Sequence, residues 1–130
     1  MGSYRLVDNA GGELLIESCA PHSKVSAAST NATSVKASKG KVYAIMAYNV
    51  NASVRYLKLY DKASAPTVGT DIPVLRFPIP GNTAGAGFNI SIPTGIDFSL
   101  GIAYAITAGV ADSDSTGVGA NEVLVNIGYN

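Results

Sequence analysis

The stretch from Val54 to Pro73, VRYLKLYDKASAPTVGTDIP, joins an alternating segment to a segment rich in turn-forming residues. Leu57 and Leu59 stand two positions apart among bulky and β-branched neighbours, which is the period of a half-buried β-strand. The proline and glycine residues that follow favour a turn. We therefore expect a strand whose leucines face the core. Its opposite face, expected to meet solvent or a neighbouring subunit, carries Tyr56, Lys58 and Tyr60.

Segments with the same period of two recur along the chain, separated by many of its fourteen glycines and six prolines. The pattern predicts an all-β protein, an antiparallel β-sandwich similar to a jelly roll, with about seven to nine short strands. For residues 13–19 a short helix is the alternative, because the apolar residues there are too few to define a period. The expected strands lie at about 33–37, 42–48, 54–60, 74–79, 88–92, 102–107 and 123–129, with short apolar pieces at 14–16 and 96–100.

The length of 130 residues fits a single domain of common size. We expect the sandwich to span residues 32–130 and residues 1–31 to form an N-terminal arm or extended segment, ordered by contact with another subunit. A frayed terminus is the alternative for that segment. The start of the chain lacks the pattern of a secretory signal, and no apolar run is long enough to span a membrane, which predicts a protein kept in solution.

The charge balance limits the classes of partner. Nine basic and nine acidic residues give a formal net charge of zero, with no long run of one sign. This predicts no general attraction to nucleic acid or to an anionic membrane, and it does not oppose self-association. The single cysteine, Cys19, excludes a disulfide within the chain.

Residues with catalytic potential are scarce. His22 is the only histidine and stands in the turn-like run Ala-Pro-His-Ser, so we expect an exposed loop histidine without a catalytic role. Cys19 lies three residues before it, but no oxyanion-donating motif surrounds the pair. The glycine-rich run 81–87 lacks the Gly-Lys-Ser/Thr ending of a phosphate loop and is expected to be a turn. The sequence thus predicts no catalytic residues, no cofactor and no enzyme.

One acidic run resembles the start of a calcium loop. Asp112 and Asp114 occupy positions 1 and 3, with a hydroxyl residue at 5 and Gly117 at 6. Glu122, however, falls at position 11 rather than at the closing position 12. We therefore predict a polar hairpin loop without metal, and a calcium site of another geometry is the alternative.

The chain has seven tyrosines and no tryptophan, so any aromatic platform for a sugar would need Tyr56 and Tyr60. Exposed tyrosines are also typical of protein interfaces, because a flat amphipathic ring buries a large area at a low entropy cost. We favour the interface interpretation over the sugar platform.

Several runs resemble small structural proteins encoded among the virion genes of tailed bacteriophages. The resemblance covers about residues 27–130. The runs are TNATSVKA at 30–37, VY at 42–43 with AYN at 47–49, RYLKLYDKA at 55–63, PTVGTD at 66–71, GIAY at 101–104 and ANEV at 120–123.

The resemblance implies a capsid decoration (cement) protein that binds and stabilises the assembled head. It implies the major capsid protein or another virion protein as partner, a homo-oligomer with a trimer favoured, and a place in the virion after assembly in the bacterial host cytoplasm. Two alternatives stay open. One is a head fibre, tail fibre or tail-tip component that contacts the host, and the other is a glycan-binding β-sandwich module.

Overall fold

The computed structural model describes residues 3–7 and 13–130, with side chains from Ser18 onward. The described part is all β and contains no helix, hence none that could cross a membrane. The strands are β1 (Ser3–Val7), β2 (Glu13–Glu17), β3 (Ala20–Val25), β4 (Thr33–Lys36), β5 (Gly40–Asn49), β6 (Arg55–Asp61), β7 (Leu75–Ile79), β8 (Ala86–Phe98), β9 (Ile102–Thr107) and β10 (Val123–Tyr129).

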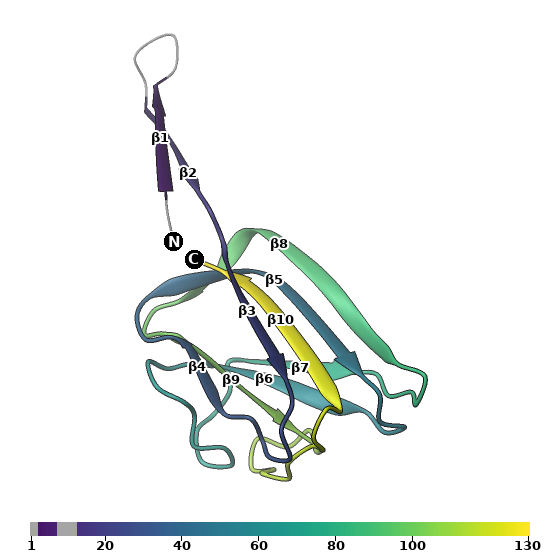
Figure 1. Ribbon diagram of the computed structural model, residues 1–130. Helices are drawn as coiled ribbons and strands as arrows, with labels where there is room; N and C mark the ends of the chain where they lie inside the picture. Colours follow the sequence, from purple (N-terminus) through teal and green to yellow (C-terminus); the bar gives the residue numbers. More distant parts are fainter. Residues whose placement is uncertain (1–2, 8–12) are drawn as a thin grey trace.

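Eight of these strands form two packed antiparallel sheets (Figure 1). The first sheet has the order β3-β10-β5-β8, and the second sheet has the order β4-β9-β6-β7. The chain passes from one sheet to the other at every connection except the hairpin between β6 and β7. This order, two interleaved four-stranded sheets, is that of a jelly roll. The predicted antiparallel sandwich with seven to nine strands is confirmed.

The core lies between the inner faces of the two sheets. Leu57 and Leu59 are fully buried there, so the predicted inward face of β6 is confirmed. Strand β9 is buried along its whole length because it lies between β4 and β6 in the middle of the second sheet. The other buried core residues are Val42, Ile45, Ala47, Ile79, Phe98, Ile102, Tyr104, Ile106, Val118, Val123, Val125 and Ile127.

Strand β3 shows that the sandwich begins earlier than residue 32. Residues 20–25 pair antiparallel with β10 at six positions, from Tyr129 opposite Ala20 to Leu124 opposite Val25. Residues 20–25, expected to belong to an N-terminal arm or extended segment, are thus a strand of the first sheet. The run Pro-His-Ser-Lys has no hydrophobic alternation, and it is a strand because the neighbouring backbone of β10 supplies hydrogen-bond partners.

The described residues before β3 form a hairpin of β1 and β2 that projects away from the sandwich (Figure 1). Glu13–Glu17 is therefore a strand, and the alternative of a short helix is wrong. Only Ser18 and Cys19 separate β2 from β3. Residues 1–2 and 8–12 of the expected arm lie outside the described residues.

Candidate interaction surface

Loops cover the outer face of the second sheet. Lys58 is fully buried, and its Nζ donates to the carbonyl oxygen of Ala111 at 2.6 Å, beneath the loop between β9 and β10. Tyr60 is buried in a small cluster with Ala103, Ala105 and Val68, the last from the loop between β6 and β7. The prediction that Lys58 and Tyr60 face solvent or another subunit was therefore wrong. The loop that directly follows β6 and the distant loop between β9 and β10 supply the cover.

Burial has an electrostatic consequence for Lys58. Removal from water lowers the pKa of the ammonium group, and the nearby negative charges of Asp114 and Asp112 oppose that shift. The two carbonyl oxygens of Ala111 and Asp114, at 2.6 and 3.5 Å, provide the compensating acceptors. Lys58 therefore anchors the 111–114 loop to the sheet.

The acidic run 112–117 belongs to that covering loop. Arg76 donates from Nε at 2.5 Å and from a terminal nitrogen at 2.7 Å to the two carboxylate oxygens of Asp112, and this pairing lowers the pKa of Asp112. Asp114 Oδ1 accepts from the backbone amide of Thr116 at 2.9 Å. Glu122 is turned toward Arg55.

The three acids of the possible calcium site thus have three different partners. Nowhere in residues 18–130 do three side chains of the metal-binding type gather at one point. The loop itself joins β9 of the second sheet to β10 of the first, so the prediction of a hairpin loop was wrong and the loop is a crossover between the sheets.

His22 lies on a strand rather than in a loop. Its Nε2 is 2.8 Å from the hydroxyl oxygen of Tyr104, a buried residue of the second sheet, and the two rings meet edge to face with centroids 5.3 Å apart. The prediction of an exposed loop histidine was therefore wrong. His22 ties the edge strand β3 to the opposite sheet, whereas Cys19 lies on the outer side and lines the groove described below.

The position of His22 predicts a pH dependence of stability. Burial, and next the positive charge of Lys24, lower the pKa of His22 in the folded state. The unfolded chain therefore binds a proton first, and stability is lost as the pH falls from about 6.5 toward the folded pKa. Urea unfolding of the wild type at several pH values should show this loss. The variant His22→Gln, which does not titrate, should show no slope in that window, and an equal slope in both proteins would contradict the assignment.

The outer face of the first sheet is different, because twelve of its outward residues are uncharged and none of the twelve is buried. The charged pair Lys41 and Asp97 lies apart from them, at the start of β5 and the end of β8. Outward positions of neighbouring strands stand side by side in three rows: Pro21, Gly128, Ala44 and Ser91; then Ser23, Asn126, Met46 and Asn89; then Val25, Leu124, Tyr48 and Gly87. We call these twelve residues the charge-free face.

A shallow apolar groove of about 460 Å³ lies across the first two rows. Gly128 and Ala44 are opposite one another at its centre, and their small size leaves the hollow. The groove begins at the point where the hairpin leaves the sandwich. Its lining includes Cys19, Pro21, Ala44, Met46, Asn126 and Gly128.

Beyond the groove, exposed apolar side chains lie in the third row and next to it. Val25, Tyr48 and Val50 are 55%, 42% and 39% exposed. Leu124 lies between Val25 and Tyr48 in the sheet. We call these four residues the apolar rim. Exposed apolar groups that adjoin one another are typical of binding surfaces.

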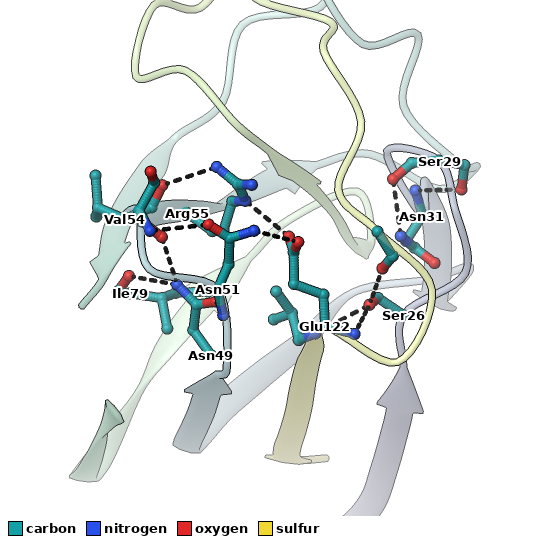
Figure 2. A network of polar contacts seen from close by, with 12 residues as sticks. Ser26, Ser29, Asn31, Asn49, Asn51, Val54, Arg55, Ile79 and Glu122 are labelled. Carbon is teal, nitrogen blue, oxygen red and sulfur yellow. Dashed lines mark hydrogen bonds and ion pairs between the residues drawn. The ribbon is translucent and has the colours of Figure 1, made fainter. Parts of the chain in front are cut away.

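A polar network holds the segments that carry the apolar rim (Figure 2). Glu122 stands at its centre and accepts from Arg55 Nε and from Asn51 Nδ2, both at 2.7 Å. The pairing with Arg55 lowers the pKa of Glu122. The two charged side chains are 13% and 16% exposed, so this ion pair is largely shielded from water.

The same network fixes the neighbouring backbone. Asn49 is fully buried, donates to the carbonyl oxygens of Ser53 and Ile79, and accepts from the amide of Asn51. On the other side of Glu122, Ser26 Oγ accepts from the amides of Glu122 and Val123 (Figure 2). Because these residues flank Val25 and Val50, the network sets the shape of the rim.

Comparison with protein-family models, with curated proteins and with solved structures found no match for this chain.

The tyrosines that were predicted to form an exposed contact surface do not form one. Tyr56 is half-buried and Tyr60 is buried, so they do not make an exposed aromatic platform. The missed surface has a signal in the sequence. Positions 44, 46, 48, 124, 126 and 128 alternate with apolar core positions and include no charged residue.

Proposed function

We propose that this chain is a capsid decoration protein of a tailed bacteriophage, which binds the assembled head and stabilises it. The observation that carries the proposal is the charge-free face with its apolar rim, on a jelly roll whose other outer face is covered by its own loops. The resemblance of residues 27–130 to virion proteins supports the same conclusion. The proposed partners are further copies of the chain, with three favoured, and the major capsid protein.

Decoration requires contact area rather than reactive groups. A protein that binds only the assembled shell stabilises the shell by mass action, and the effect recurs at every site. The apolar rim supplies exposed apolar area that a capsid subunit would remove from water. Several rims on one oligomer would bind with increased avidity if they reach equivalent sites together.

Binding to undecorated capsids tests the proposal. Purified protein should co-sediment with capsids and saturate, and the double substitution Val25→Asp and Tyr48→Asp should weaken binding by at least about 100-fold, because two apolar contacts are lost and two charges are desolvated. Ile72→Asp is the matched control, since Ile72 is exposed on the loop over the second sheet and should not matter. Absence of binding by the wild type under assembly conditions would refute the decoration role.

Labelled protein on intact virions separates this proposal from a fibre or tail-tip role. The label should lie at regular positions on the head. Label confined to the tail would assign the chain to the host-contacting apparatus instead. A glycan-binding role has less support, because Tyr60 does not reach the surface.

A further inference from the structure

The β1–β2 hairpin has one wholly apolar face. The register pairs Tyr4 with Ile16 and Leu6 with Leu14, and these four residues share one face of the two-stranded sheet. The alternate positions form the other face and include three charged residues. They are Ser3, Arg5, Val7, Glu13, Leu15 and Glu17.

No third strand extends this hairpin among the described residues. Within the described ranges each of its strands pairs only with the other, and the hairpin stands away from both sheets of the sandwich (Figure 1). A two-stranded hairpin is marginal in water unless a further layer covers its hydrophobic face. The apolar face therefore needs a covering surface.

The groove on the same copy is not within reach of its own hairpin. Strand β2 leads into β3 through Ser18 and Cys19 alone, and β3 is itself the edge of the sheet that bears the groove. The hairpin leaves past the end of that sheet (Figure 1). Covering its own groove would require the chain to reverse within two residues. A neighbouring copy has no such restriction.

The chemical character and the position of the groove suit the apolar face of a hairpin. It is apolar and uncharged, so it has no charge that the four apolar side chains of the hairpin would leave desolvated. It also begins at Cys19 and Pro21, directly beside the root of the hairpin. Two copies placed root to root, or a closed ring of copies, therefore bring each hairpin to a neighbouring groove.

We propose that the hairpin of each copy lies with its apolar face in the groove of another copy of the same chain. Every copy then acts both as donor of a hairpin and as acceptor. This inference concerns the purified protein and does not depend on the proposed role in a virion.

Docking in a groove and pairing of two hairpins differ in what happens to the groove. Four large apolar side chains bury roughly 60–120 Å² each, or roughly 240–480 Å² for a hairpin face, whether the face meets a groove or another hairpin. Docking in the groove also covers the groove, whereas hairpins packed only on one another leave it open.

Sedimentation equilibrium of the full chain tests the arrangement with two variants. Leu6→Asp places a charge on the apolar hairpin face, and Met46→Lys places one in the groove. Both should raise the dissociation constant of the oligomer at least about 100-fold. Leu15→Asp on the other hairpin face and Ile72→Lys on the covering loop should associate as the wild type does. Thermal unfolding of each variant checks that the sandwich remains folded.

Mixing the two defective variants identifies the occupant. Leu6→Asp keeps an intact groove and Met46→Lys keeps an intact hairpin, so the mixture should form a complex that neither forms alone, detected by native mass spectrometry. A monomeric wild type at high concentration would overturn the proposal. Normal association of Met46→Lys would also overturn it, because the hairpins would then be covered by some surface other than the groove. A mixture that forms no complex would overturn it as well. Capsid binding by a monomeric wild type would leave the decoration role standing.

Discussion

Replacing Glu122 by alanine is expected to lower the free energy of unfolding by about 2–4 kcal/mol. The substitution removes the acceptor of Arg55 and of Asn51 at 2.7 Å each, and leaves a guanidinium group in a largely buried position without its partner. Urea unfolding followed by circular dichroism would measure the change. A loss below about 0.5 kcal/mol would show that the pair behaves as an ordinary surface ion pair.

The acid side of the stability curve provides an independent check on Glu122. Its pKa is lowered in the folded state, so its contribution is present above the ordinary glutamate pKa and is lost as the pH falls through the folded pKa. Glu122→Gln removes this titration while its amide oxygen can still accept from Asn51. The variant should therefore lose less stability than the wild type below about pH 4.5. The difference in the free energy of unfolding between the two proteins should therefore be smaller at acidic pH than at neutral pH.

Glu122 also affects the proposed binding surface. The network around it fixes the turn that carries Val50 and the end of β3 that carries Val25. Loss of the central acceptor should loosen both segments. We therefore expect Glu122→Ala to weaken capsid binding even under conditions where the sandwich stays folded.

Replacing Tyr60 by alanine should lower the free energy of unfolding by about 3–5 kcal/mol, and the melting temperature by roughly 10–15 °C. The ring is buried between the second sheet and its covering loop, so truncation leaves a cavity beneath Val68. Differential scanning calorimetry would measure both quantities. An unchanged melting temperature would mean that the loop does not cover the ring in solution.

Tyr60→Phe separates the contribution of the ring from that of its hydroxyl group. The hydroxyl oxygen is buried and has no hydrogen-bond partner among the described residues. Its removal should therefore change stability by less than about 0.5 kcal/mol or increase it slightly. The contrast with alanine makes Tyr60 a structural residue, and a loss of assembly in Tyr60→Ala would report unfolding rather than a lost contact.

The strands could be predicted well because each depends on local alternation. Leu57 and Leu59 recur with period two, and this periodicity placed them correctly in the core. The same signal identified an antiparallel sandwich. It did not find β3, since the residues from Pro21 to Val25 have no apolar periodicity and become a strand only beside β10.

The candidate surface was predicted on the wrong sheet for a related reason. Alternation separates the two faces of a strand, but it does not say which outer face is later covered. Lys58 and Tyr60 were placed on a free surface, whereas the 62–74 and 108–122 loops return over them. The absence of charge at Ala44, Met46 and Leu124 is visible in the sequence, but only the strand order shows that these positions adjoin.

The all-β class, the inward leucines of β6 and the neutral charge balance follow from local period and composition, so the amino-acid sequence alone specifies them. Three features come from the packing of the chain in space: which sheet keeps an open face, the contact of His22 with Tyr104, and the pairing of Glu122 with Arg55. Those contacts join residues 67 to 82 positions apart. They depend on how the sheets and loops pack, and no local pattern encodes that packing.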